Sequence, residues 1–390
     1  MSRAAEAEKD VAPVVTRSFV GRRAETEEAL SRLSEESQAG LRQYSLERML
    51  GYGVDYADAI ELRGRVLEGH DWRQAATELA ETALNFADNA LGAGGAPTRI
   101  ACLRRASALL RISQTLMVTD SPERSAIFAR AADLYGRAAE LTRDRQPVLI
   151  DTDSGKLAGW LVPAAADAVA STILIGGVEG WAMDFDSMSD ALAARGVETL
   201  ALDGPGQGET RMIHRHFLST DWPAAYRGAI DFFEKRAPGR PIGFIGNSMG
   251  GSFAMAVAAA DQRIRACCNN GGPFAPGLVP PQGTFFAKMM TMCNASAPEQ
   301  ATEIWSSVVA TQAGPNAGYP LLMVQGGEDP LVSNELSDFL FANAPTEDKQ
   351  MVVFSDGDHC IYRHKQDRDI LISDWMRARL SGQSSPEDAT

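Results

Sequence analysis

From Gln146 onward, short apolar segments alternate with helical segments, and this alternation constrains the possible fold more than any other feature. Strands that alternate with crossover helices build parallel sheets with helices on both faces. The pattern therefore predicts an α/β fold with a mainly parallel sheet of eight strands. We expect these strands at 147–151, 156–163, 171–175, 197–203, 241–245, 264–269, 319–325 and 350–354.

The part of the chain before residue 146 has a different character, because it is rich in Ala, Leu, Arg and Glu and carries almost no strand signal. Apolar residues recur at helical spacing from Trp72 to Ala90, a Gly-rich break follows, and a second helix is expected at 98–117. A third helix should begin with Ser121 as its N-cap and Pro122 as its first residue.

These patterns divide the chain into segments with predicted boundaries. We expect an N-terminal all-helical domain over 1–145, of which roughly the first 15 residues are disordered. An α/β domain should then occupy 146–380, before a polar, disordered tail at 381–390. The alternation fails at 273–318, which is rich in Met, Phe and Pro. Placed at the carboxyl edge of the sheet, it would be either a small lid or an ordinary crossover helix with a long loop.

Charge and cysteine content exclude some classes of protein. The formal net charge of −14 argues against binding to nucleic acid or to an anionic membrane surface. The five cysteines show no CxxC spacing, which indicates reduced thiols and a cytoplasmic protein. The N-terminus has no apolar signal segment, and no apolar run approaches the ~18 residues of a membrane helix. We therefore expect a cytoplasmic protein whose partner is a small molecule.

The segment Gly246-Asn-Ser248-Met-Gly250 matches the pattern G-x-S-x-G. An apolar strand precedes it and a helix of small residues follows it, which is the context of a nucleophile elbow. In such an elbow a tight bend exposes the serine, and the glycines let neighbouring backbones approach. Ser248 is thus the candidate nucleophile, whereas the alternative is a Gly-rich turn with an N-cap serine.

A serine hydroxyl needs a base, and histidine suits this role because its ordinary pKa is about 6.5. Of the five histidines, His359 lies just after the last expected strand, in a loop that can reach Ser248. His364 is the main rival. The acid that orients the histidine should lie between serine and histidine in the chain, which favours Asp329, after the strand at 319–325, with Glu328 as the fallback.

Attack on a carbonyl also needs hydrogen-bond donors for the developing oxyanion. One should be the backbone N–H of Met249, directly after the nucleophile. The other should come from the loop 176–180, where we favour Val178 over Gly177. Glu179 in this loop is a candidate substrate-binding residue, but we favour the alternative that it caps the helix containing Phe185 and Met188.

Several motifs together resemble those of α/β-hydrolases that carry an N-terminal helical domain. They are the segment 202–209 (LDGPGQGE), the loop 176–179, and His359-Cys360 followed by 373–375 (SDW). The chain is similar from about residue 40 to 380 to 2,6-dihydroxypseudooxynicotine hydrolases, FrsA-like esterases and fungal polyketide-shortening hydrolases.

The resemblance implies an enzyme without a metal ion or an organic cofactor. It also implies that the helical domain forms part of the substrate cavity and of a homodimer contact. One departure concerns the additional glutamate that C–C-cleaving members are expected to use after the elbow, because residues 265–297 contain no acid. If this chain has an auxiliary carboxylate, Glu179 is the better candidate.

The sequence thus predicts a serine hydrolase that forms an acyl-enzyme. The expected reaction is the cleavage of a C–C bond beside a ketone, or of an acyl bond, in an aromatic or polyketide-like molecule. The alternatives are a carboxylesterase acting on simple esters, an acyltransferase and, least favoured, a binding protein without activity.

Overall fold

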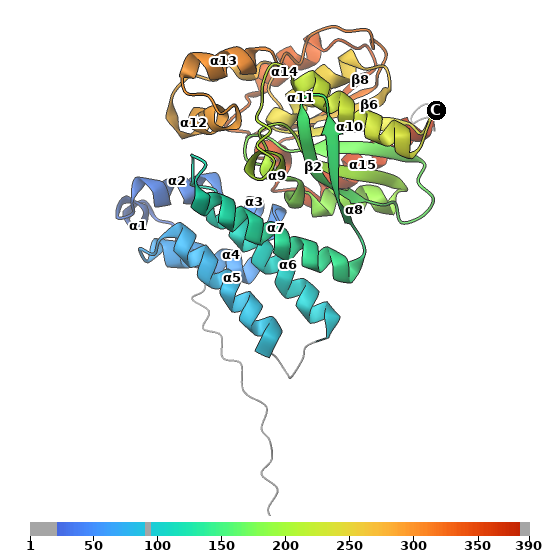
Figure 1. Ribbon diagram of the computed structural model, residues 1–390. Coiled ribbons are helices and arrows are strands. Elements are labelled where there is room, and N and C mark those ends of the chain that lie inside the picture. The colour runs from blue at the N-terminus through green and yellow to red at the C-terminus, as the bar shows by residue number, and fades with distance from the viewer. Residues whose placement is uncertain (1–21, 90–94, 383–390) are drawn as a thin grey trace, which may run out of the picture.

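In the computed structural model, which describes residues 22–89 and 95–382, the strands form one sheet in the order β1-β2-β4-β3-β5-β6-β7-β8 (Figure 1). Strand β2 pairs antiparallel with β1 and β4, and the other neighbours are parallel. The predicted α/β-hydrolase fold with a mainly parallel sheet of eight strands is confirmed. The strands are β1 Gln146–Thr152, β2 Gly155–Val162, β3 Ala170–Ile175, β4 Val197–Asp203, β5 Ile242–Asn247, β6 Ile264–Asn270, β7 Leu321–Gly326 and β8 Lys349–Phe354.

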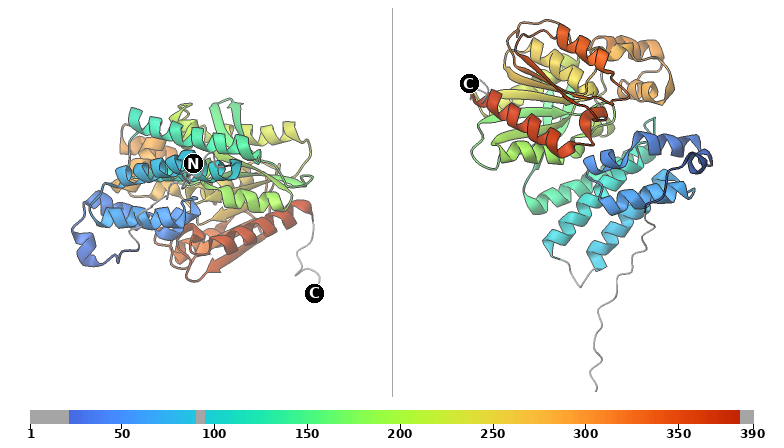
Figure 2. Two further views of the ribbon diagram at one scale, coloured as in Figure 1. Left: turned by 90° about the horizontal axis from the view of Figure 1, so that it is seen from below. Right: turned by 180° about the vertical axis from the view of Figure 1, so that it is seen from behind.

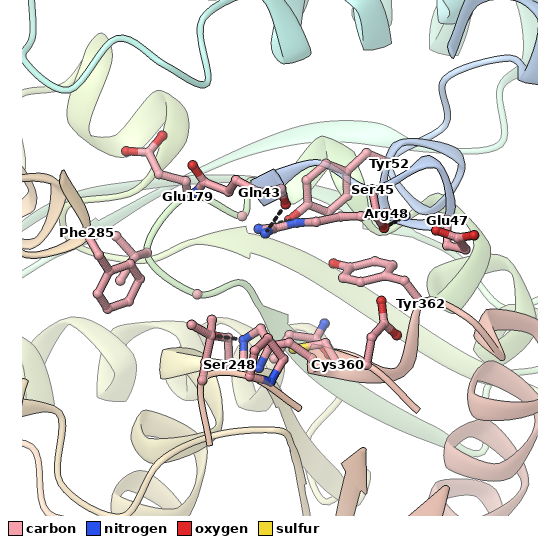
Figure 3. A pocket seen from close by; sticks show the side chains of 18 of the residues that line it. Gln43, Ser45, Glu47, Arg48, Tyr52, Glu179, Ser248, Phe285, Cys360 and Tyr362 are labelled. Carbon is pink, nitrogen blue, oxygen red and sulfur yellow. Dashed lines mark hydrogen bonds between the residues drawn. The ribbon is translucent and has the colours of Figure 1, made fainter. Parts of the chain in front are cut away.

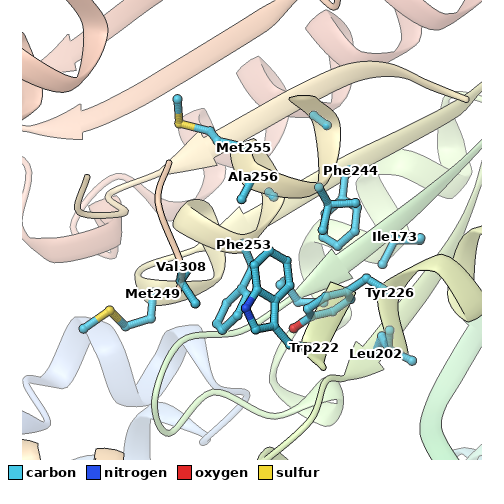
Figure 4. Packing of buried hydrophobic residues seen from close by; sticks show 14 of the residues in the cluster. Ile173, Leu202, Trp222, Tyr226, Phe244, Met249, Phe253, Met255, Ala256 and Val308 are labelled. Carbon is cyan, nitrogen blue, oxygen red and sulfur yellow. The ribbon is translucent and has the colours of Figure 1, made fainter. Parts of the chain in front are cut away.

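Helices cover both faces of the sheet, and the central strands are therefore buried on both sides. On one face, Tyr226 of helix α10 packs against Phe244 of β5 and Phe253 of helix α11 (Figure 4). On the other face, Ile245 belongs to a core that includes residues of α8 and α15. The helices of this part are η1 Ala182–Asp184, α8 Asp186–Ala194, α9 Gly208–Met212, α10 Trp222–Arg236, α11 Met249–Ala260, α14 Asn334–Asn343, η3 His359–Ile361 and α15 Lys365–Ser381.

The part before β1 is helical in the described residues. Its longest helix follows the expected capping pattern, since the Ser121 hydroxyl accepts a hydrogen bond from the Arg124 amide. The helix predicted at 98–117 ends at Ser113, because residues 114–116 form a turn instead of continuing the helix. The helices are α1 Glu27–Ser31, α2 Glu35–Gln43, α3 Leu46–Gly51, α4 Tyr56–Leu67, α5 Trp72–Asn89, α6 Ala96–Ser113 and α7 Pro122–Thr142.

The helical part packs directly against the sheet part (Figure 2). Tyr362, which follows β8, belongs to the apolar core of the helical part and makes an edge-to-face contact with Tyr52. Nearby, Arg111 of α6 donates to the Met183 carbonyl and forms an ion pair with Asp184. The change from helix to strand falls between α7 and β1, and the division into two domains at residue 145 remains a prediction.

The segment 273–318, which was predicted to be a lid or a crossover, runs from β6 to β7. It contains η2 Pro276–Leu278, α12 Gly283–Met292 and α13 Pro298–Ser306. Helix α12 contacts the helical part, because Lys288 Nζ donates to the Thr115 carbonyl at 2.7 Å and the Thr291 hydroxyl donates to the Val118 carbonyl.

The predicted disorder of the first residues and of the tail concerns residues outside the described ranges, except that Ser381 belongs to α15. None of the described helices is long and apolar enough to cross a membrane.

Candidate active site

Ser248 occupies the tight turn between β5 and α11. Its backbone has a positive φ of 54° with ψ −131°, a strained conformation that costs a non-glycine residue about 1–3 kcal/mol. A Cβ at Gly246 would overlap the Gly250 carbonyl, and a Cβ at Gly250 would lie 2.5 Å from the Gly176 carbonyl oxygen. The two glycines of the G-x-S-x-G segment are therefore required for this bend.

The structure brings the three residues of the predicted triad together at the carboxyl edge of the sheet. His359 follows β8, and its Nε2 lies 2.8 Å from the Ser248 hydroxyl oxygen. Its Nδ1 lies 2.8 Å from Oδ2 of Asp329, which follows β7. The other oxygen of Asp329 accepts from the Leu331 and Val332 amides, so the carboxylate has a fixed orientation. This geometry allows a proton to pass from Ser248 to His359.

The surroundings of His359 act on its pKa in opposite directions. Burial lowers the pKa, whereas the neighbouring Cys360 and the hydrogen-bonded Asp329 raise it. The raising contributions are larger, so the pKa of His359 lies above its ordinary value of about 6.5. The charged imidazolium form of His359 is thereby stabilised.

The loop 176–180 lies against Ser248, since a Cβ at Gly177 would be 2.7 Å from the Ser248 Cβ. Gln207 Nε2 donates to the carbonyls of both Gly176 and Gly177, at 2.7 Å each. In a trans peptide the N–H points opposite to the C=O, so the Val178 N–H is directed away from Gln207. Met249 is the first residue of α11, and its amide has no acceptor within the helix.

A cavity of about 710 Å³ adjoins Ser248 and His359. Its walls come from both parts of the chain. Arg48 and Tyr52 belong to the helical part, and Phe285 belongs to α12 (Figure 3). The cavity is large enough for a small-molecule substrate.

Glu179 lines this cavity but does not cap a helix, so that interpretation was wrong. Helix α8 has no side-chain cap, and the turn before it is closed by Asp184, which accepts from the Trp181 amide. Glu179 Oε2 instead accepts from Arg124 Nη2 at 2.7 Å. Burial raises the pKa of Glu179, but Arg124 and its other cationic neighbours hold it below the ordinary value. Its Oε1 is buried and accepts no hydrogen bond from the described residues. The role of Glu179 in binding a substrate remains a prediction.

The rival residues of the sequence analysis have other partners. His364 Nε2 lies 2.8 Å from the Asp356 carboxylate at the surface. Glu328 forms an exposed ion pair with Arg363. Neither contact involves Ser248 or His359.

Three residues that line or brace the site were not predicted from the sequence. Gln207 lies in the segment 202–209. The glycines of this segment indicate a tight turn, but they do not indicate that the Gln207 side chain donates to the carbonyls of Gly176 and Gly177. Arg48 and Lys288 reach the cavity from the helical part and from α12. Local sequence gave no signal for either, because their positions depend on how distant segments pack. Burial lowers the pKa of Lys288 to about 8, against the raising effect of Glu179.

Comparisons with known proteins agree with this architecture. The model of the family described as "Alpha/beta hydrolase family" matches residues 172–369. The chain is 24% identical over 341 residues to 2,6-dihydropseudooxynicotine hydrolase of Paenarthrobacter nicotinovorans. This alignment covers 84% of this chain and 90% of the relative. It is 28% identical over 249 residues to the alpha/beta hydrolase gkaG of Penicillium citrinum, over 57% of each chain.

Two solved structures share the fold along most of the chain. The crystal structure of 2,6-dihydroxy-pseudo-oxynicotine hydrolase has a TM-score of 0.75 at 23% identity and covers 87% of this chain and 97% of its own. Wild-type AbyA5 has a TM-score of 0.69 at 17% identity, with coverage of 90% and 96%. Both include the helical part as well as the sheet.

Proposed function

The chain belongs to the alpha/beta hydrolase family, and from this premise we propose that it is a serine hydrolase whose nucleophile is Ser248. The observation that carries the proposal is the hydrogen-bonded series Ser248–His359–Asp329 beside a cavity of about 710 Å³. A binding protein without activity would have no need to maintain a strained serine backbone next to an oriented histidine.

In the proposed mechanism, the Ser248 oxygen attacks a substrate carbonyl carbon while His359 Nε2 takes the hydroxyl proton. The Met249 and Val178 amides donate to the resulting oxyanion. When the tetrahedral intermediate collapses, His359 returns the proton to the leaving atom and Ser248 keeps the acyl group. A water molecule, deprotonated by His359, then attacks the acyl carbon and releases the acid; in an acyltransferase an alcohol would replace this water.

For the bond that breaks, we propose a C–C bond beside a ketone, or an acyl bond, in an aromatic or polyketide-like molecule. The support is the resemblance to C–C-cleaving hydrolases together with the apolar wall that Phe285 gives the cavity. In C–C cleavage the proton from His359 goes to the departing carbon or its enol oxygen, so the leaving group is a ketone or an enol.

A simple carboxylesterase is the second candidate, because Glu179, the only predicted auxiliary carboxylate, is already held in an ion pair with Arg124. Ester cleavage needs only the triad and the oxyanion donors, since the alkoxide leaves once His359 protonates it.

The nucleophile is tested by labelling with a fluorophosphonate probe. Wild-type protein should be labelled and should turn over an accepted substrate, whereas Ser248→Ala should show neither and should melt at nearly the same temperature. Near-normal turnover in a folded Ser248→Ala variant would overturn the assignment. The bond is tested by offering p-nitrophenyl esters and aryl 1,3-diketones side by side, and efficient ester turnover without any diketone cleavage would favour the carboxylesterase.

We also propose a cytoplasmic homodimer. The five cysteines are unpaired and buried, which suits a reducing compartment. The dimer is inferred from the family resemblance, and sedimentation equilibrium of the purified protein would test it.

A further inference from the structure

A partly buried arginine of the cavity, Arg48, has no carboxylate partner among the described residues. Among the positively charged side chains that line it, Arg363 is paired with Glu328, and Lys288 is under the influence of Glu179. Arg42 and Arg48 are within ion-pair distance of no carboxylate in the part of the chain that the structure describes. Of these two, Arg42 is exposed, whereas Arg48 is partly buried. The neighbouring carboxylate of Glu47 points away from the guanidinium (Figure 3).

The partners of Arg48 fix its position without neutralising its charge. Its Nε and Nη2 donate to the Tyr52 hydroxyl, at 3.2 and 2.9 Å, and its Nη1 donates to the Gln43 carbonyl at 3.1 Å. The guanidinium lies 4.8 Å from the ring centre of Tyr44 and 5.3 Å from that of Tyr52. Burial raises the pKa of each of these tyrosines to about 12, so both phenols stay protonated and uncharged near neutral pH.

The remaining donors of Arg48 are available to a ligand. A guanidinium has five N–H groups, and the three hydrogen bonds above use one each of Nε, Nη1 and Nη2. One N–H on each terminal nitrogen is therefore unused among the described residues. Figure 3 shows the guanidinium across the cavity from Ser248, with Phe285 at the side.

We propose that Arg48 binds an anionic pair of oxygens on the substrate, at the side of the cavity opposite the carbonyl that Ser248 attacks. A carboxylate and an ionised 1,3-diketone share this chemistry, since both present two oxygens that carry one negative charge to two N–H groups. The apolar body of the substrate would then lie between the two ends, beside Phe285. The inference rests on the proposed function only in taking the ligand to be the substrate.

The test measures binding instead of turnover, so it remains readable if the proposed reaction is wrong. In a Ser248→Ala background, the affinities for 4-phenylbutyrate and for its uncharged amide, 4-phenylbutyramide, are compared by calorimetry. Because hydrogen bonds to charged groups are strong, the carboxylate should bind about 10- to 100-fold more tightly than the amide. Arg48→Gln should abolish this preference, and Arg48→Lys should retain only part of it.

A third ligand separates the two sources of anionic oxygen. Benzoylacetone is titrated below and above the pH at which its enol ionises. If the site favours the diketone, its affinity should rise with ionisation in the protein that keeps Arg48, but not in the Arg48→Gln variant.

Arg42→Gln is the matched control, because Arg42 lines the same cavity from the exposed side and bonds only to Gln38 among the described residues. This variant should keep the anionic preference, and melting curves should show that every variant is folded. Equal affinities for charged and uncharged ligands in the protein with Arg48 would overturn the inference. So would a folded Arg48→Gln variant that still prefers the anion.

Discussion

At the scale of single residues, we expect the hydrogen bond between His359 and Asp329 to influence the pH at which the proposed base can act. His359 must be uncharged to accept the Ser248 proton, and its raised pKa means that activity falls as the pH drops through that raised value. The carboxylate of Asp329 favours the charged imidazolium, because opposite charges in contact stabilise each other. Removing the carboxylate charge therefore has two separable effects, one on the rate and one on the pH profile.

We expect Asp329→Asn to lower kcat by roughly 10⁴-fold, because the amide no longer holds the correct histidine tautomer. It should also move the acid limb of the kcat/KM profile to lower pH, since the pKa of His359 falls when its negative neighbour is lost. The measurement is kcat/KM against pH for both proteins on one substrate. An acid limb that stays in place, or that moves to higher pH, would show that Asp329 does not act on His359 in this way.

The meeting of Ser248, Asp329 and His359 could be predicted from sequence because each follows a parallel strand, and parallel strands end at the same edge of the sheet. Glu179 was harder, because its partner Arg124 lies 55 positions earlier, in a helix whose packing no local pattern specifies. Arg48 was missed for the same reason. Periodicity predicts which residues are buried, but it does not predict which distant side chains meet across a cavity.

At the scale of elements, the packing of α3 onto the chain after β8 connects the helical part to His359, the proposed base. A Cβ at Gly51, the last residue of α3, would overlap the ring of Tyr362. Tyr362 follows His359 by three residues and packs edge-to-face on Tyr52, with 5.5 Å between the two ring centres. A displacement of this ring is therefore expected to disturb the position of His359.

Gly51→Ala should destabilise the protein by about 1–3 kcal/mol, because overpacking outweighs the gain from a better helix former. It should also lower kcat. Gly136→Ala, in the interior of α7, is the matched control, since its new Cβ would meet Trp160 at an ordinary 3.6 Å. That variant should be more stable by roughly 0.5–1 kcal/mol. Urea unfolding and turnover measure both effects, and a stabilised Gly51→Ala variant would refute the packing argument.

The predicted strands and the long helices lie close to the observed ones, because their apolar periodicity is strong. Helices α1 to α4 were not predicted, since they are short and rich in charged residues. Their N-caps, Thr26, Ser34, Ser45 and Asp55, were visible in the sequence and are the signal that could have located them. Capping residues alone do not distinguish a short helix from a turn, which is why tertiary packing decides such cases.

At the scale of the whole molecule, buried charges join the helical part to the sheet part. Arg111 donates to the carbonyls of Tyr52 and Met183, on opposite sides of the contact, and forms an ion pair with Asp184 at 3.1 Å. Burial raises the pKa of Asp184 to about 6, and Arg111 acts in the opposite direction. Loss of the arginine would leave a buried carboxylate without its cation.

Arg111→Met should therefore cost about 3–5 kcal/mol of stability at neutral pH. The loss should shrink as the pH falls. Without Arg111, the pKa of Asp184 in the folded variant lies even further above its value in the unfolded chain than it does in the wild-type protein. The folded variant thus takes up a proton more readily than the unfolded one, and acid stabilises it relative to wild type. Unfolding free energies at pH 5 and pH 8 test this, and adding Asp184→Asn should recover part of the loss. A deficit that is the same at both pH values would contradict the assignment.

The contact between Gly51 and Tyr362 also bears on how the protein is made. A ribosome releases the helical part first, yet one wall of that part's apolar core is a tyrosine that is synthesised more than 300 residues later. The side of helix α3 that Tyr362 covers therefore stays uncovered until β8 has joined the sheet and Tyr362 can pack against it. Completion of the helical part's core and the placement of His359 thus both depend on the segment that follows β8.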